Sequence, residues 1–384
     1  MGAVVKVLSS FGLSCALLLL LGLLTWLGTL EQVDHGLFEV QKRYFESFFL
    51  LHSWGPLKIP LPGANLVLSV LFLNLMVGGI LRLRRGTATV GILITHLGIG
   101  LLLVSGFVKM YYSQDGHLAL YETESSNEFQ SYYRWEIAVS EYLAEGELRE
   151  HLVPEEDFLD AVGSRTVTLT SPDLPFDLAV NHFMANCRPM LKGPMFDVEV
   201  PVVDGAFLRP LQLSKTAENN VAGLYVEVRD KQGEAVQPGI LWGLESEPLL
   251  VSSGGRSWAI GLRHERYSMP FTIVLDKFTK KDHPRMTMAK EFSSDVTVVE
   301  GEAQRPIKIS MNEPLRDEGL VLYQASWGPS NARPGDPLFS TLSVVRNPAD
   351  QYPLYACIVI AAGLLVHFMR KLTRYVRSEA RKTS

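Results

Sequence analysis

Four long apolar runs interrupt an otherwise mixed pattern of hydrophobic and polar residues along the 384-residue chain. A helix that crosses a membrane needs roughly 17–25 apolar residues, and each run is of that length. We therefore predict four transmembrane α-helices, three of them N-terminal and one C-terminal. They cover residues 7–30, 64–81, 87–108 and 353–369.

The segment between the third and fourth runs has a different pattern. Apolar and polar residues alternate there over short stretches, and Gly, Pro, Asn or Asp separates most of them. Alternation with a period of two is typical of half-buried strands. We predict a β-sandwich or an open barrel of antiparallel strands with few helices. The clearest stretches are residues 165–170, 223–229, 271–277, 295–299, 307–311, 319–325 and 342–345.

These patterns divide the chain into three parts. Residues 1–108 hold three transmembrane helices with an outer loop at 31–63, residues 109–352 form a large β-rich domain, and residues 353–384 form the fourth helix and a basic tail. Apolar residues in the outer loop recur at helical spacing. They predict a short helix that lies in the membrane interface or packs under the outer domain. These residues are Leu37, Val40, Tyr44, Phe48 and Leu51.

Basic residues cluster after the second and the fourth apolar runs. Loops rich in Lys and Arg stay on the cytoplasmic side of a membrane. Four spans then put both termini in the cytoplasm and residues 109–352 outside. The two clusters are Arg82, Arg84 and Arg85, and Arg370, Lys371, Arg374, Arg377, Arg381 and Lys382.

Composition excludes several classes of protein. The formal net charge is -5, which argues against a nucleic-acid partner. The three cysteines form neither a Cys-x-x-Cys nor a Cys-x-x-Cys-His motif, so the chain is not itself a c-type cytochrome, and thiol exchange is not its expected activity. The sequence has no motif for a self-contained catalytic site, so we predict no catalytic residues in this chain.

His96 is the most informative single residue, because it lies within the uncharged run 87–108. An ionisable side chain at that depth is costly and usually faces a partner, a cavity or a ligand. A neutral imidazole is also a good axial ligand for haem iron. Gly100 shares the helix face of His96, where it leaves room either for a flat macrocycle or for a neighbouring helix. His96 is therefore a candidate haem ligand or a packing histidine.

His367 is the second histidine in an apolar run, three residues before Arg370. One interpretation is an interfacial histidine near the cytoplasmic headgroups. A rise of 1.5 Å per residue also puts it at a depth similar to that of His96. His367 is therefore a second, weaker candidate for binding haem.

Several stretches, taken in order, resemble the ResB family of cytochrome c biogenesis proteins. The resemblance covers nearly the whole chain and is weakest between about residues 143 and 254. Each motif is short, but the ordered set is specific. The stretches are GTLEQ, QKRYFESFF, LNLMVGGILRLRRG, THLGIGLLLVSG, KEFSSDV, ISMNEPL, GLVLYQASWGP, LSVVRNPADQYPLY and VHFMRK.

The resemblance implies a role in haem handling. In this family the histidine of the third span, here His96, is implicated in binding haem within the membrane. The chain is then expected to bind a b-type haem transiently, together with a CcsA-type (ResC) membrane partner. The pair moves haem outward and attaches it to the Cys-x-x-Cys-His site of apocytochrome c. This chain is then a non-catalytic or co-catalytic subunit of a holocytochrome c synthase in the bacterial inner membrane, with its large domain in the periplasm.

Two other classes of function remain open at this stage. In the first, His96 and His367 hold a permanent b-type haem in a membrane electron carrier. In the second, the chain is a scaffold without haem, whose outer domain binds another protein. The haem content of the purified protein separates the three.

Overall fold

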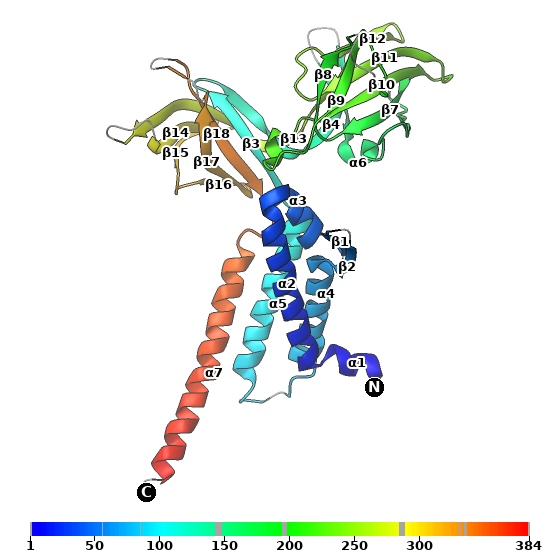
Figure 1. Cartoon of the computed structure of the whole chain (residues 1–384). Helices are drawn as coiled ribbons and strands as arrows, with labels where there is room; N and C mark the ends of the chain where they lie inside the picture. The colour runs from blue at the N-terminus through cyan, green and yellow to red at the C-terminus, as the bar shows by residue number, and fades with distance from the viewer. Residues whose placement is uncertain are drawn as a thin grey trace. The chain divides into compact units, whose positions relative to one another are not determined.

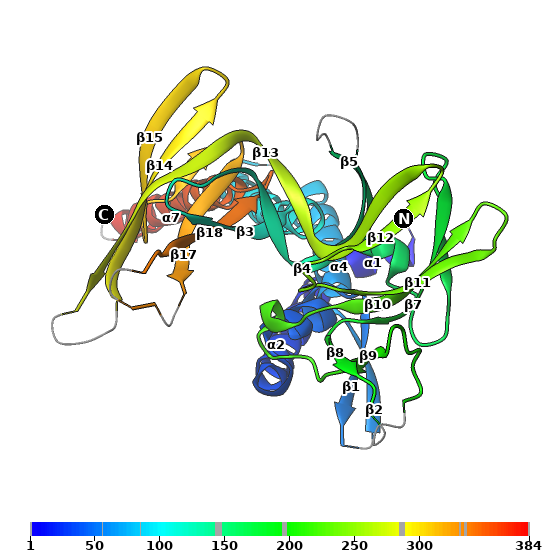
Figure 2. The same cartoon turned by 90° about the horizontal axis from the view of Figure 1, so that it is seen from above.

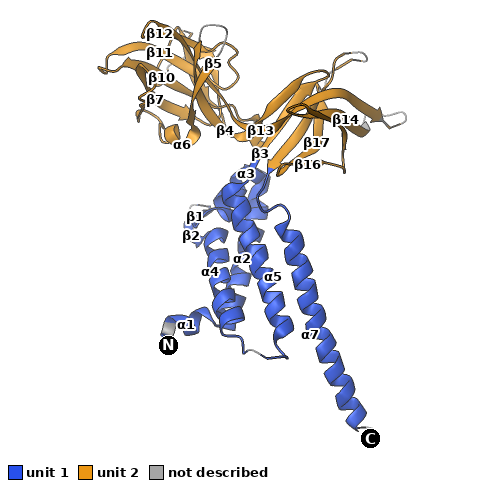
Figure 3. Ribbon diagram, turned by 180° about the vertical axis from the view of Figure 1, so that it is seen from behind, with its two compact units in different colours: residues 1–114, 346–384 blue, residues 115–345 orange. Residues whose placement is uncertain are grey.

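The computed structural model describes residues 2–55, 57–84, 86–142, 148–193, 198–283, 289–329, 332–333 and 336–382. The chain forms two compact units (Figure 3). One contains residues 1–114 and 346–384, and the other contains residues 115–345. We call them the helical unit and the β unit.

Four helices of the helical unit are long and apolar enough to cross a membrane, as the four apolar runs predicted (Figure 1). The second of them is α4 continued by the π-helix η2. The elements of this unit are α1 (Ala3–Leu8), α2 (Phe11–His35), α3 (Leu37–Val40), the π-helix η1 (Gln41–Phe45), β1 (Phe49–Trp54), β2 (Leu57–Pro62), α4 (Ala64–Asn74), η2 (Leu75–Leu81), α5 (Val90–Tyr112) and α7 (Tyr352–Lys382).

The first long helix begins at Phe11 and not at residue 7 as predicted, because a break at Ser9 and Ser10 separates it from α1. Asn74 stabilises this break. Its amide donates hydrogen bonds to the carbonyl oxygens of Leu8 (2.7 Å) and Ser10 (3.1 Å). The Leu8 carbonyl lies at the C-terminal end of α1, where helix carbonyls lack a partner within the helix, and the buried Asn74 side chain supplies one.

The outer loop differs from its prediction. The helical pattern holds only through α3 and η1, where Val40 and Tyr44 are buried, and the chain then forms the hairpin of β1 and β2. Leu51, predicted on the helical face, lies in β1 instead. The run Phe49–Trp54 is rich in apolar and aromatic residues and is followed by Gly55, which has a positive φ of 59°. Such a run with a glycine turn favours a hairpin over a longer helix.

The β unit is built from antiparallel sheets, and each of the seven predicted strand segments overlaps a strand, although only Val167–Leu169 of residues 165–170 is in one. Its elements are β3 (Gln114–Tyr121), β4 (Ser125–Tyr142), β5 (Leu148–Pro154), α6 (Glu155–Phe158), β6 (Val167–Leu169), β7 (Phe176–Met184), β8 (Cys187–Leu191), β9 (Ala206–Pro210), η4 (Ala217–Asn219), β10 (Gly223–Asp230), β11 (Ala235–Trp242), β12 (Leu249–Ser253), β13 (Arg256–Asp282), β14 (Ala289–Glu300), β15 (Ala303–Ser310), β16 (Leu315–Asp317), β17 (Leu320–Gly328) and β18 (Phe339–Arg346).

Two long strands, β4 and β13, pair with each other and run through both hydrophobic cores of the β unit (Figure 2). The first core lies between this pair and the sheet β11-β10-β7-β6, and it contains Ile137 and Trp258. The second core contains Phe129 and Ile273 and is closed by β14 to β18. Each long strand therefore supplies residues to both cores, which ties the unit together.

Candidate functional site

The candidate site in the helical unit is centred on His96 of α5. Its Nδ1 lies 2.8 Å from the carbonyl oxygen of Gly79 in η2. A Cβ added to Gly79 would lie only 2.8 Å from the same Nδ1. Glycine at position 79 is therefore what lets the imidazole approach the backbone so closely.

The Gly79 carbonyl is free to accept this bond because of its place in the helix. It lies in the last turn of η2, which ends at Leu81, and the final carbonyls of a helix have no partner within the helix. The helix has π geometry here, and such segments are frequent at functional sites. The imidazole of His96 satisfies a backbone acceptor that α4 and η2 leave open.

This hydrogen bond determines which nitrogen of His96 carries the proton. A carbonyl oxygen only accepts, so Nδ1–H is the donor, and in the neutral ring Nε2 keeps its lone pair. Histidines that bind metal commonly donate their other N–H to a backbone carbonyl, which fixes the ring and its tautomer. The donor set of His96 therefore fits an axial ligand to haem iron through Nε2.

Gly100 lies one turn further along α5 and makes a matching contact. A Cβ added there would lie 3.0 Å from the Cε of Met76 in η2. Met76 therefore occupies the space beside Gly100, and a macrocycle would fit there only if this flexible side chain moved. The contacts between η2 and α5 are reciprocal. Gly79 of η2 packs against the His96 side chain of α5, and Gly100 of α5 packs against the Met76 side chain of η2.

His367 lies on a different side of α5. Its backbone nitrogen is 2.6 Å from the position of a Cβ added to Gly91, five residues before His96. Five residues correspond to about 7.5 Å along a helix. Small residues allow this close packing, because Gly363 of α7 likewise approaches Thr95. In the described part of the chain, no contact joins the two imidazoles.

The outer loop contains a polar cluster that spacing alone did not reveal. Glu31, at the end of α2, accepts hydrogen bonds from the hydroxyl of Tyr44 (2.8 Å) and from Arg43 (3.1 Å). Nδ1 of His52 lies 2.5 Å from the same hydroxyl. Glu31 belongs to the stretch GTLEQ, whereas Arg43 and Tyr44 belong to QKRYFESFF. These contacts join the two stretches and fix the outer loop to the end of α2.

Comparison with protein families matches part of the β unit. Residues 239–336 match the ResB-like family. ResB is the family that the ordered motifs indicated, and it is associated with cytochrome c biogenesis. No curated protein matches the chain. The matched residues run from β11 past the end of β17, so they lie in the β unit and do not include His96.

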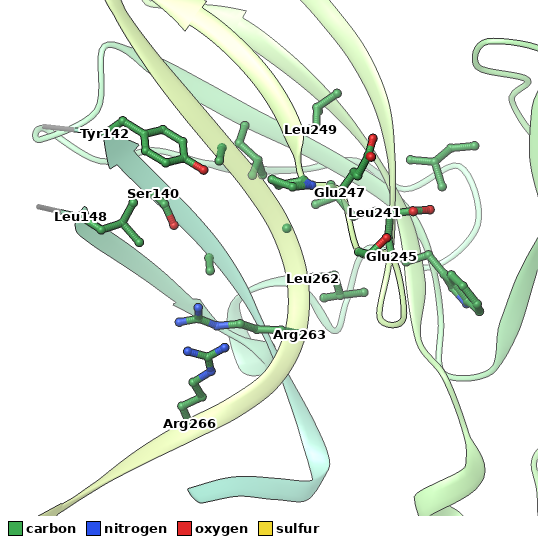
Figure 4. Close-up of a pocket in the computed structure, with 18 residues that line it drawn as sticks. Ser140, Tyr142, Leu148, Leu241, Glu245, Glu247, Leu249, Leu262, Arg263 and Arg266 are labelled. Carbon is green, nitrogen blue, oxygen red and sulfur yellow. The ribbon is translucent and has the colours of Figure 1, made fainter. Parts of the chain in front are cut away.

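The ResB-like segment borders a groove of about 280 Å³ in the β unit (Figure 4). The small residues Ala138, Ser140 and Gly261 are among those that line it. A Cβ added to Gly261 would meet nothing within 4 Å, so the strand is open at this point. Arg263 lies at one side of the groove and donates to Glu136 (2.8 Å) and Glu150 (2.7 Å). Arg263 is therefore already paired with two carboxylates, and Glu245, Glu247 and Arg266 also line the groove.

Cys187 is buried in the β unit and is a free thiol, as are Cys15 and Cys357. Burial raises the pKa of its thiol to about 12. A thiol that stays protonated at neutral pH is a poor nucleophile and a poor metal ligand. Cys187 packs in a hydrophobic cluster with Leu208 and Tyr225, which gives it a packing role.

His264 on β13 makes the stability of the β unit depend on pH. Its ring stacks on Trp135 with 3.9 Å between the centroids, and burial, followed by the neighbouring His117, lowers its pKa from 6.5 to about 4. Between these values the unfolded chain binds a proton that the folded unit does not. Proton uptake by the unfolded chain therefore lowers the free energy of unfolding as the pH falls. We expect the contribution of His264 to be complete above pH 6.5 and to be lost by pH 4, a decrease of up to about 3 kcal/mol.

Thermal unfolding of the full chain in detergent, followed between pH 7.5 and pH 4.5, measures this dependence. The variant His264→Gln should flatten the curve, whereas His151→Gln, which changes a histidine elsewhere in the same unit, should leave its slope intact. Equal slopes for the unchanged chain and His264→Gln would contradict the expectation.

Proposed function

We propose that this chain is the ResB-type component of a membrane complex that carries haem outward and delivers it to apocytochrome c. The observation that carries the proposal is the orientation of His96. Its Nδ1 is held by the Gly79 carbonyl inside an apolar helix, which leaves Nε2 available. The match of residues 239–336 to the ResB-like family supports the same role. Haem is the cargo, and its iron supplies the coordination position that Nε2 fills.

The chain's own residues perform three tasks in this proposal. His96 holds the iron while haem is within the membrane. Gly79 orients the imidazole and fixes its tautomer. The β unit contacts the largely unfolded apocytochrome through exposed strand edges and the groove at Gly261, because an extended peptide can add to an open sheet edge. The second axial ligand comes from a CcsA-type partner, since His367 contacts another side of α5.

The proposed location is a bacterial inner membrane, with both termini in the cytoplasm and the β unit in the periplasm. The support is the distribution of basic residues, which follow η2 and extend along the last turns of α7. Arg82 and Arg84 belong to the first cluster, and Arg85 lies outside the described residues.

Reporter fusions test this orientation. A reporter that works only in the cytoplasm should be active after Gly86 and after Ser384, and inactive after Glu218. An exported reporter should give the opposite result at all three positions. A cytoplasmic reporter that is active after Glu218 would put the β unit on the wrong side for meeting an apocytochrome and would remove the proposal.

Haem content tests the proposed function directly. The chain should be purified with and without a co-expressed CcsA-type partner, and the haem measured by its visible spectrum. We expect less than one haem per chain, rising when the partner is present. One tightly bound, redox-cycling haem per chain without a partner would support the electron carrier. No haem under either condition would support the scaffold.

A further inference from the structure

Two histidines of the β unit lie on either side of an irregular stretch of β4. His117 on β3 is opposite Gln130, and His264 on β13 is opposite Trp135. Gln130 is also opposite Arg266 of β13. The four residues from Ser131 to Arg134 therefore face the single residue Glu265 and form a bulge. The two histidines are near enough for His117 to lower the pKa of His264.

The bulge has its own hydrogen bonds. The Ser131 hydroxyl accepts from the backbone N–H groups of Tyr133 (3.3 Å) and Arg134 (3.1 Å). Bulges of this kind re-aim side chains and are over-represented next to functional sites. Residues that lie opposite each other on paired strands share one face of the sheet. His117, Gln130 and Arg266 therefore share a face, and His264 joins them because it lies two residues from Arg266.

Neighbouring aromatic rings hold both imidazoles in place. His117 stacks on Tyr132 with 5.1 Å between the centroids, and His264 stacks on Trp135 at 3.9 Å, each with an interplanar angle of 27°. In both residues Nδ1 is buried and has no hydrogen-bond partner among the described residues. An unpartnered buried polar atom is costly, and a bound ion is one established reason for its presence.

We propose that His117 and His264 together hold a transition-metal centre. Neutral imidazole nitrogens suit zinc, copper, nickel and iron. Burial lowers the pKa of both histidines, so both rings are neutral at pH 7 and able to bind metal. The metal is either a free ion or the iron of haem, since both use the same imidazole ligation.

The site has two protein ligands and leaves the other coordination positions open. Among the described residues, no group of three or more His, Cys, Asp and Glu side chains is arranged to hold a metal ion. Water or a group brought by the incoming metal therefore completes the coordination. Such an open site binds an exchangeable metal and differs from a closed structural site, which takes four protein ligands.

The test uses the full chain in detergent with His96→Ala, so that the membrane histidine does not contribute. Co²⁺ is titrated in one arm and followed by its visible absorption; haemin is titrated in the other and followed by its Soret band. We expect saturable binding of one equivalent in one arm, weakened at least tenfold by His117→Gln and by His264→Gln. The matched control is His151→Gln, a histidine of β5 near Trp258.

Three results would overturn the site: no saturable binding in either arm, equal binding by the control and the two variants, or a first coordination shell without two imidazoles. X-ray absorption on the metal-loaded His96→Ala chain counts the imidazoles directly. This measurement needs no change at position 117 or 264, so it decides the question even where those variants fail to fold. The outcome is independent of the function proposed for His96.

Discussion

Replacing His96 with alanine should abolish cytochrome c assembly while the chain still accumulates in the membrane. Alanine is a good helix former and is more apolar than histidine, so insertion should not suffer. The loss follows because Nε2, the proposed ligand atom, is removed together with the Nδ1 bond to Gly79. A histidine that only packs would cost about 1 kcal/mol for one interhelical hydrogen bond and would leave assembly largely intact.

Three measurements separate these outcomes: holocytochrome yield, the amount of the chain in the membrane fraction, and haem that co-purifies with it. Added imidazole should restore part of the yield, because it can occupy the space that the truncated side chain leaves beside Gly79. His367→Ala is the matched control and should be mild, since His367 contacts α5 at Gly91. Normal assembly and normal haem content in His96→Ala would refute the ligand role.

Replacing Gly79 with alanine should have the second largest effect. The new Cβ would lie 2.8 Å from Nδ1 of His96 and 3.0 Å from Cδ1 of Leu75, so the imidazole must move away from the carbonyl that orients it. Loss of such an orienting contact typically costs 10- to 100-fold in metal affinity or activity. We expect a loss of about that size in co-purified haem, with His96 itself still present.

Two glycines of α5 provide matched controls for this substitution. A Cβ added to Gly106 meets nothing within 4 Å, and one added to Gly100 meets only the flexible Met76 and, at 3.9 Å, Leu75. Gly106→Ala should behave like the unchanged chain, and Gly100→Ala should be close to it. The shape of the haem spectrum provides a further readout, because a displaced imidazole changes ligation even where haem remains bound. Equal haem content and equal spectra in Gly79→Ala and Gly106→Ala would exclude an orienting role for Gly79.

Long-range contacts explain what the sequence patterns missed in the β unit. β4 was not among the predicted strands, because its second half does not alternate: residues 136–141 are all buried. Two of them, Glu136 and Glu141, are charged and pair with Arg263 and Arg256, more than 100 residues away. In the sequence alone, a glutamate is expected at the surface. Glu136 and Glu141 were therefore not recognisable as buried strand residues.

The same reasoning applies to the candidate sites. His96 was identified because an ionisable residue within an apolar run is easily seen in the sequence. Its partner Gly79 was not identified, because no sequence pattern marks a backbone carbonyl that accepts a side-chain hydrogen bond. The π geometry of η2 also depends on packing. His117 and His264 are 147 positions apart, and only the pairing of both strands with β4 brings them to one face.

The sequence by itself determined the number of long apolar helices, the β-rich character of the segment between them and the place of His96 within one of those helices. Each of these is a local property, because the length of a helix needed to cross a bilayer and the alternation along a strand are both written along the chain. Tertiary structure decided the break before Phe11, the hairpin after η1, the bond from His96 to Gly79 and the imidazole pair beside the β4 bulge. These depend on which distant segments pack together, and residue spacing carries no information about that.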